Sequence, residues 1–462
     1  MNKILLILVI VFGLTSCESK SNKDYIILKG KVLNPTTEQF KLRNRDGEGL
    51  FSANISKDGT FVVDTITTGF GTYRFEGTGI NRVNMYLTNG GEYNLTFDEK
   101  NMVDTAELTG PMLNPSNYLM TKGKRIDSLR GMSFTAYKTL EPSAFKAKGI
   151  MVRDNLLTYL DSFPDMPKEF VQFERQELIN YYLLYLVRYE YLHGQVTGTL
   201  DTFRVSDEFL KDLEDVDYLN EAEFKQRGYY KSLVKEYFEL KAKKSSEETG
   251  DNYHITELKT FGAIPNEYIK NNLLALAAKS DLSEIHNLDD YYNTFLSVSN
   301  SEENNENVTE RYKELKKLAK GSPSPIFTDY INHAGGTSSL TDFRGKYLYI
   351  DIWATWCSPC LKEVPFLKEV EKKYHGKNIE FVSISVDIKK MEGAWRKMVT
   401  DKELSGVQLL AEGAWSSSII KGYQIKGIPR FILIDPEGNI VSAKAPRPSQ
   451  SELITLFQEL GI

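Results

Sequence analysis

Cys357 and Cys360 are the residues whose type and spacing most directly suggest chemistry. They lie in the stretch WCSPC, between an apolar run (346–353) and a charged, helix-like segment (361–374). Two cysteines at this spacing can alternate between a dithiol and a disulfide, or they can supply half of a zinc site. The third cysteine and the five histidines are scattered along the chain. Because a zinc cage usually needs four ligands close together, we expect no metal and a redox-active pair, with an inert or zinc-binding pair as the alternative.

The position of the pair between a strand and a helix has chemical consequences. Cys357 is expected at the N-terminus of the helix, where unpaired amides and the helix dipole stabilise a thiolate. Pro359 fits the first helical turn because its missing N–H would have no partner there. We predict that Cys357 is the exposed nucleophile, which attacks a partner disulfide, and that Cys360, one turn deeper, resolves the mixed disulfide.

The surroundings of this pair carry a family resemblance. The motif W-x-x-W-C-x-x-C (353–360) follows a buried strand, and Gly427-Ile428-Pro429 precedes another. Over roughly 322–462 the chain resembles the thioredoxins, specifically the TlpA/ResA-like membrane-tethered thiol-disulfide oxidoreductases. The resemblance implies a thioredoxin fold, a redox-active disulfide with no other cofactor, and a cis-proline at Pro429 that faces the disulfide. A peroxiredoxin, which shares the fold, would need a Thr-x-x-Cys where W-C-x-x-C stands.

Two carboxylic acids are candidates for handling the protons of the cysteines. Asp351 matches the buried strand carboxylate of classical thioredoxins, whose pKa is raised by desolvation and which can accept the proton of the resolving thiol. Glu363 matches the acidic residue with which TlpA/ResA-like proteins tune their cysteines, and its i+3 spacing places it on the same helix face as Cys360. The alternatives are a structural buried Asp and a solvated surface Glu. Many close relatives carry Asn at the position of Asp351, so the pKa values of the cysteines stay open.

The first residues read as a targeting signal rather than as structure. Asn2-Lys3 precedes an apolar run, Ile4–Gly13, and then Leu14-Thr15-Ser16-Cys17. This arrangement resembles the lipobox of bacterial lipoproteins, in which the cysteine is lipidated and becomes the first mature residue. An ordinary secretory signal with an incidental cysteine is the alternative. The lipobox predicts a lipid anchor at Cys17 and a dithiol that faces the periplasm, outside the cytoplasm, in the cell envelope.

Changes in hydrophobic periodicity divide the rest of the chain. Alternating, strand-like runs with regular turn signals over 25–112 predict a small all-β sandwich or barrel, which resembles the β-rich domain preceding envelope thioredoxins of Bacteroidetes lipoproteins. Helical periodicity over 113–320 predicts an all-α middle domain, and alternating strands and helices over 321–462 predict an α/β thioredoxin fold. With a signal peptide at 1–16 and a flexible tether at 17–24, the expected fold class is multidomain.

Individual elements follow from the same periodicity. Strands are expected at Tyr25–Leu33, Thr60–Thr65, Gly71–Glu76, Val83–Leu87, Tyr93–Phe97, Lys346–Trp353, Ile379–Val386, Arg430–Asp435 and Ile440–Ala443. Helices are expected at Glu169–Leu192, 222–245, 264–280, 305–320, Leu361–Tyr374 and Ser451–Leu460. We expect Gly194 to follow the first of these helices as its C-cap, Glu302–Glu306 to be a solvated loop, and Gly321–Pro325 to be a linker.

Composition and charge narrow the possible functions. The 462 residues carry a formal net charge of −6, which gives no electrostatic reason to bind nucleic acid. No apolar run reaches the length of about 18 residues that a spanning helix needs. The function predicted is reduction of disulfides in exported proteins, including the haem-binding cysteines of apocytochromes, with electrons from a membrane donor of the thiol-relay type. The alternative is an envelope lipoprotein that binds a protein or glycan and carries an accessory thioredoxin domain.

Overall fold

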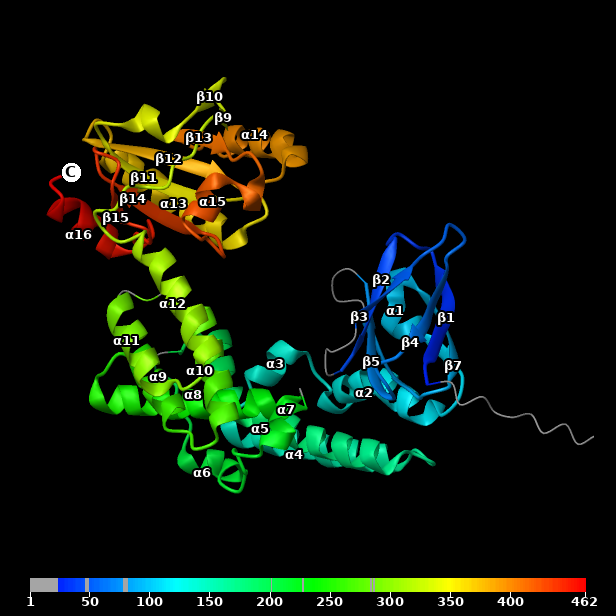
Figure 1. Cartoon of the computed structure of the whole chain (residues 1–462). Coiled ribbons are helices and arrows are strands. Elements are labelled where there is room, and N and C mark those ends of the chain that lie inside the picture. The colour runs from blue at the N-terminus through cyan, green and yellow to red at the C-terminus, as the bar shows by residue number, and fades with distance from the viewer. Residues whose placement is uncertain are drawn as a thin grey trace, which may run out of the picture. The chain divides into compact units, whose positions relative to one another are not determined.

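The computed structural model describes residues 24–45, 50–77, 82–200, 202–226, 228–282, 285 and 287–462. The chain divides between Glu248 and Thr249 into two compact units, whose elements are labelled in Figure 1. This division falls inside the predicted helical domain 113–320, so the boundary predicted at residue 321 does not coincide with it. Cys17 and the predicted signal peptide lie outside the described residues. Within the described ranges, no helix has both the length and the apolarity needed to cross a bilayer.

The N-terminal unit begins with a β-sandwich, as the alternating pattern predicts. One sheet has the strand order β4-β1-β7-β8 and the other the order β3-β2-β5-β6. Aromatic side chains from both sheets fill the space between them, including Phe40, Phe75 and Phe97. The strands are β1 (Ile26–Leu33), β2 (Gln39–Asn44), β3 (Leu50–Asn54), β4 (Thr60–Ile66), β5 (Gly71–Glu76), β6 (Arg82–Leu87), β7 (Glu92–Asp98) and β8 (Glu107–Thr109).

Helices complete the N-terminal unit. They are α1 (Met102–Thr105), α2 (Leu113–Arg130), α3 (Phe134–Lys138), α4 (Pro142–Asp161), α5 (Lys168–Thr197), α6 (Asp207–Leu210), α7 (Glu221–Lys225) and α8 (Tyr229–Thr249). The predicted C-cap at Gly194 is wrong, because α5 continues to Thr197 and is capped by Gly198 in the left-handed conformation. Gly194 instead allows a close approach of the chain, since a Cβ there would lie 2.8 Å from the Cα atom of Leu200.

Four helices open the C-terminal unit. They are α9 (Tyr253–Gly262), α10 (Glu267–Asp281), α11 (Leu288–Val298) and α12 (Glu302–Lys316). The loop predicted at Glu302–Glu306 is wrong, because these residues form the first turn of α12. The Ser301 side chain caps that turn by accepting a hydrogen bond from the N–H of Asn304. Glu302 and Glu303 follow at the positive end of the helix dipole, where acidic side chains are stabilising.

The expected linker Gly321–Pro325 is paired with the rest of the C-terminal unit. The N–H of Gly321 donates to the carbonyl oxygen of Ile440 at 2.8 Å, and the N–H of Ser324 donates to that of Gly438 at 3.0 Å. Just before this segment, Leu318 belongs to the same buried apolar cluster as the cysteines. Helix α12 is therefore joined to the following domain by packing and backbone pairing.

The remaining residues form a seven-stranded mixed sheet with helices on both faces (Figure 1). Its strand order is β10-β9-β13-β12-β11-β14-β15, with β11 parallel to β12 and antiparallel to β14. The strands are β9 (Tyr330–Asn332), β10 (Thr337–Ser338), β11 (Tyr347–Trp353), β12 (Ile379–Ser385), β13 (Val407–Leu410), β14 (Arg430–Ile434) and β15 (Ile440–Ser442). The helices are α13 (Ser358–Lys373), α14 (Glu392–Asp401), α15 (Ser418–Gly422) and α16 (Ser451–Glu459).

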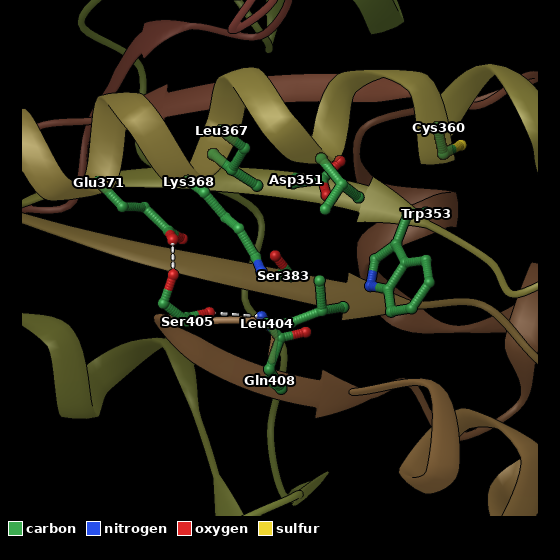
Figure 2. A pocket seen from close by; sticks show the side chains of 11 residues that line it. Asp351, Trp353, Cys360, Leu367, Lys368, Glu371, Ser383, Leu404, Ser405 and Gln408 are labelled. Carbon is green, nitrogen blue, oxygen red and sulfur yellow. Dashed lines mark hydrogen bonds between the residues drawn. The ribbon is translucent and has the colours of Figure 1, made fainter. Parts of the chain in front are cut away.

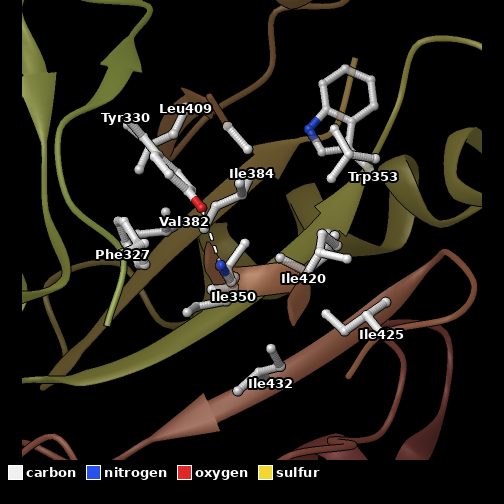
Figure 3. Close-up of a cluster of buried hydrophobic side chains, with 14 of the residues drawn as sticks. Phe327, Tyr330, Ile350, Trp353, Val382, Ile384, Leu409, Ile420, Ile425 and Ile432 are labelled. Carbon is white, nitrogen blue, oxygen red and sulfur yellow. Dashed lines mark hydrogen bonds between the residues drawn. The ribbon is translucent and has the colours of Figure 1, made fainter. Parts of the chain in front are cut away.

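Two apolar clusters cover the faces of this sheet. Ile350 and Ile352 of β11 belong to one cluster, whose side chains are drawn in Figure 3. Tyr349 belongs to the other, together with Leu367 of α13 and Phe457 of α16. Strands buried on both faces explain why β11 reads as a nearly continuous apolar run. Because side chains alternate along a strand, Asp351 lies on the same face as Tyr349, beneath α13.

Candidate active site

The disulfide lies where β11 ends and α13 begins. Cys357 and Cys360 are bonded to each other, with their Cα atoms 5.3 Å apart. Cys357 is the N-cap residue of α13, and its sulfur accepts a hydrogen bond from the N–H of Cys360 at 3.2 Å. The predicted placement of Cys357 at a helix N-terminus is therefore observed. An amide that would otherwise lack a partner points at this sulfur, which favours a thiolate once the bond is reduced.

The prediction that Cys357 is exposed is wrong for the disulfide form. Each cysteine is only 4% exposed, and both belong to the same buried apolar cluster as Ile350 and Ile352. The sulfur of Cys357 is directed to Cys360 and to the first turn of α13, which withdraws it from solvent. The neighbouring indole of Trp356 is 59% exposed. Trp356 is therefore far more accessible to solvent than either cysteine of the motif.

Pro429 lies at the same end of β11 as the disulfide. The Ile428–Pro429 peptide bond is cis, as the family resemblance implies. Ile352 of β11 is opposite Arg430 of β14 in the antiparallel register. Continuing that register by one residue brings Pro429 beside Trp353, four residues before Cys357. The cysteine motif and the Gly-Ile-Pro motif, which are 72 residues apart in sequence, thus meet where the neighbouring strands β11 and β14 have their C-terminal and N-terminal ends.

Asp351 is buried on β11, beneath α13. Its Oδ1 atom has no hydrogen-bond partner among the described residues. Burial, together with the negative charges of Glu371 and Glu363, raises the pKa of Asp351 from 3.8 to about 8. This agrees with the sequence-based expectation of a carboxyl whose pKa is raised by desolvation. At neutral pH the Asp351 side chain is mainly a carboxylic acid.

A small cavity of about 10 Å³ connects Asp351 with Cys360 (Figure 2). Three polar atoms in its lining are buried without a hydrogen-bond partner in the described structure: Asp351 Oδ1, Trp353 Nε1 and Gln408 Oε1. A polar cavity of this size has room for about one water molecule, which needs two to four such partners. The cavity therefore has the room and the polar partners for one water molecule beside Asp351 and Cys360, which both line it.

Glu371 closes the other end of the same cavity and was missed by the sequence reasoning. It accepts a hydrogen bond from the hydroxyl of Ser405, whose carbonyl oxygen accepts one from Gln408 Nε2 at 2.7 Å. Burial raises the pKa of Glu371. Helical spacing could have identified Glu371 from the sequence, because positions 360, 363, 364, 367 and 371 share one face of α13.

Glu363 is neither solvated nor directed at the cavity. It is 9% exposed, and its two carboxylate oxygens accept hydrogen bonds from the N–H and hydroxyl of Ser449 at 3.1 and 3.0 Å. Arg447 Nη1 lies 3.9 Å from Oε1. The segment before α16 therefore holds Glu363, and its negative charge acts on Asp351 from there.

Asp387 is a second residue that the sequence reasoning missed. It is 1% exposed and follows β12. Its carboxylate accepts hydrogen bonds from the N–H of Thr355 at 2.9 Å, the hydroxyl of Thr355 at 2.8 Å and the hydroxyl of Ser385 at 2.7 Å. These bonds fix the loop that leads into Cys357. The sequence feature that could have identified Asp387 is its position just after a buried strand. Because this strand runs parallel to β11, the C-terminal ends of the two strands lie side by side.

Comparison with known proteins agrees with this geometry. The Redoxin family matches residues 319–455. The thiol-disulfide oxidoreductase ResA of Bacillus cereus (strain ZK / E33L) is 28% identical over 148 residues, which cover 32% of this chain and 81% of the relative. ResA of Bacillus thuringiensis subsp. konkukian is 30% identical over 129 residues, which cover 28% and 70%. The solved thioredoxin domain of a thiol-disulfide oxidoreductase from Bacteroides vulgatus is 32% identical, covering 31% of this chain and 98% of that one, with a TM-score of 0.28.

The matched residues hold the whole site described above. The Redoxin match contains the disulfide, Asp351, Glu363, Asp387 and Pro429. The predicted family is confirmed by these relatives, and they match the C-terminal part of the chain. Through that part, the chain belongs to the TlpA/ResA-like thiol-disulfide oxidoreductases of the thioredoxin family and is an oxidoreductase enzyme.

Proposed function

We propose that this oxidoreductase reduces disulfides in exported proteins, with Cys357 as the attacking residue and Cys360 as the resolving one. The observation that carries the proposal is the disulfide at the N-terminus of α13 near a buried carboxyl with a pKa of about 8. A carboxyl with this pKa is present in both its acid and its ionised form near neutral pH, so it can accept a proton in one direction of the exchange and donate one in the other.

The reaction begins from the dithiol. The Cys357 thiolate attacks one sulfur of the substrate disulfide, forms a mixed disulfide and releases the first substrate thiolate, which takes up a proton. In molecules in which Asp351 is ionised, Cys360 then transfers its proton to this carboxylate, directly or through a water in the cavity, and attacks the sulfur of Cys357. This step releases the second substrate thiolate, which is protonated as it leaves, and re-forms the disulfide. Two electrons pass from the enzyme dithiol to the substrate.

The substrate is held at the edge formed by Trp356 and the cis-proline. The backbone before Pro429 pairs with an extended substrate segment, as the family resemblance implies, and the exposed indole of Trp356 supplies apolar contact area. Haem-binding cysteines of an apocytochrome, close together in an unfolded segment, are one substrate of this kind. Each cycle needs two electrons and two protons from a donor, for which we propose a membrane protein of the thiol-relay type.

The location that we propose is the cell envelope, facing the periplasm. Its support is the apolar segment Ile4–Gly13 followed by the lipobox-like sequence that ends at Cys17. Lipidation at Cys17 would anchor the chain to a membrane, since about 0.8 kcal/mol is gained per buried CH₂. Mass spectrometry of the protein from its native membrane tests this: an N-terminal diacylglyceryl-cysteine at position 17 is expected, and an unmodified Cys17 contradicts it.

The direction of the reaction is tested by the reduction potential of the Cys357–Cys360 pair. Thiol trapping across defined redox buffers reports the potential, with Cys357→Ser as the variant that cannot form the bond. We expect a value near the −270 mV or so of thioredoxin, which suits a reductase. A value near about −120 mV, that of a strong disulfide oxidant, would make the protein a disulfide donor instead. Absence of a reversible couple would exclude catalysis by this pair.

A further inference from the structure

The helices of the C-terminal unit bring together a second group of chemically capable side chains. His254 and Glu257 lie three residues apart on one face of α9, and Asp281 is the last residue of α10. One ligand atom from each of these residues lies within 4.8 Å of the others. Asn252 caps α9 by accepting hydrogen bonds from the N–H groups of His254 and Ile255. The backbone that carries two of the three side chains is therefore fixed by its own cap.

The cluster places two carboxyl groups together with little solvent. Glu257 is 4% exposed, and the side chain of Asp281 is 13% exposed. Nδ1 of His254 lies 3.0 Å from Oδ2 of Asp281. Burial opposes ionisation of Asp281, but hydrogen bonds from His254, Ser280 and Glu257 outweigh it and lower the pKa. Two carboxyl groups this close share a proton unless a cation neutralises both.

A fourth polar group points to a missing ligand. Tyr291 of α11 is fully buried, and its hydroxyl has no hydrogen-bond partner at ordinary geometry in the described part of the chain. The hydroxyl lies beside Asp281 and Glu257: after burial, their negative charges are the main causes that raise the pKa of Tyr291. A buried hydroxyl without a partner is costly and rare in folded proteins. A water or ligand bound within the cluster would give this hydroxyl its partner.

A simple ion pair explains only part of this arrangement. The hydrogen bond between His254 and Asp281 raises the pKa of the imidazole, while the positive charge of Lys444 opposes that rise. Glu257 accepts a hydrogen bond from the hydroxyl of Tyr253 at 2.9 Å, but neither this bond nor the ion pair gives the hydroxyl of Tyr291 a partner. A divalent cation would take one oxygen from each carboxylate and could carry a water toward this hydroxyl.

We propose that His254, Glu257 and Asp281 bind one divalent transition-metal ion of the Zn²⁺ type, with the hydroxyl of Tyr291 donating to a ligand carboxylate or a metal-bound water. One imidazole nitrogen and two carboxylate oxygens suit Zn²⁺, whereas Mg²⁺ prefers an all-oxygen octahedron. The ion joins the start of α9 to the end of α10. This site differs from the expectation of no metal, which considered only cysteines and histidines; two of the three donors here are carboxylates.

Calorimetric titration of the full chain with ZnCl₂ tests the proposal. The protein carries Cys17→Ser and is kept oxidised, so that no free thiol binds the metal. We expect saturable binding of one Zn²⁺ per chain. The variants His254→Gln, Glu257→Gln and Asp281→Asn should each lower the affinity at least about tenfold, because each removes a donor atom. His375→Gln, at an exposed histidine outside the cluster, serves as the matched control and should bind like the parent.

Co²⁺ provides a readout that is independent of affinity. Bound Co²⁺ should give visible absorption bands that His254→Gln alters and His375→Gln leaves unchanged. If a cluster variant fails to fold, as judged by circular dichroism, the titration of the parent protein still decides. Absence of one-to-one binding by the parent, or equal binding by folded cluster variants, would overturn the proposal. Neither result depends on the redox activity of the disulfide.

Discussion

Replacing Asp351 by Asn should change how the stability of the C-terminal domain depends on pH. An aspartate in the unfolded chain ionises with a pKa near 3.8, whereas in the folded domain the pKa of Asp351 is about 8. Between these values the folded state holds one proton more than the unfolded state. The stability of the parent protein therefore falls as pH rises through this window, and it falls no further above about pH 8. Asparagine removes this contribution.

The expected magnitude follows from the size of the shift. One pKa unit corresponds to about 1.4 kcal/mol, so the stability of the Asp351→Asn variant relative to the parent should grow by about 4 kcal/mol between pH 4 and pH 7. Any constant cost of burying the amide adds equally at every pH and leaves this slope unchanged. Because the disulfide keeps both cysteines from titrating, the measurement is made on the oxidised protein.

The four tryptophans make this measurement selective. Trp353, Trp356, Trp395 and Trp415 all lie within the Redoxin match, so their fluorescence follows unfolding of that domain in urea. Asp401→Asn, at an exposed carboxylate of α14, is the control and should show no growing difference. A stability difference between Asp351→Asn and the parent that stays constant from pH 4 to pH 8 would refute the raised pKa, and with it the proton exchange with Cys360.

Three further changes test other parts of the structure. Asp387→Ala should destabilise the same domain by about 3 kcal/mol, because it leaves the N–H of Thr355 and the hydroxyl of Ser385 unsatisfied; an unchanged urea midpoint in tryptophan fluorescence would contradict this role. Glu371→Gln should lower the pKa of Asp351 by removing a nearby negative charge. In the Glu371→Gln background, the stability gained by Asp351→Asn should therefore stop growing at a lower pH than in the parent protein. An unchanged end point would argue against electrostatic coupling between Asp351 and Glu371. Gly30→Ala should destabilise the β-sandwich by about 2 kcal/mol or more, because the added Cβ would overlap the carbonyl oxygen of Leu95. Circular dichroism should show this loss of stability, while the urea midpoint measured by tryptophan fluorescence stays the same. Equal effects on both signals would contradict the prediction.

The predicted strands are short runs rich in β-branched and aromatic residues, whereas β2 contains one aromatic and no β-branched residue. β2 was missed although Phe40 and Leu42 face the core, because Lys41 and Arg43 give it a polar composition. The pairing of β1 with β7 is parallel and joins residues more than 60 positions apart, such as Ile27 and Glu92. Alternation within one segment carries no information about such a partner, so the sheet order could not be predicted.

The candidate site shows the same division between local and distant signals. The disulfide, Asp351 and Pro429 could be predicted because each belongs to a short motif beside a buried strand. Glu371 and Asp387 act through Ser405 and Thr355, which lie 34 and 32 residues away and meet them only through packing. The exposure of Cys357 was mispredicted for a related reason, because burial of its sulfur depends on the first turn of α13 closing around the bond.

The pairing of residues 321–324 with β15 bears on how this chain could have been assembled by recombination. The segment matched by the family begins at residue 319, yet Leu318 already lies in its apolar core and the compact unit begins at Thr249. A gene exchange with its crossover at residue 320 would leave the incoming domain without the apolar surface of α12. In this chain the domain that carries the disulfide is therefore completed by Leu315 and Leu318, two apolar residues that precede the family match.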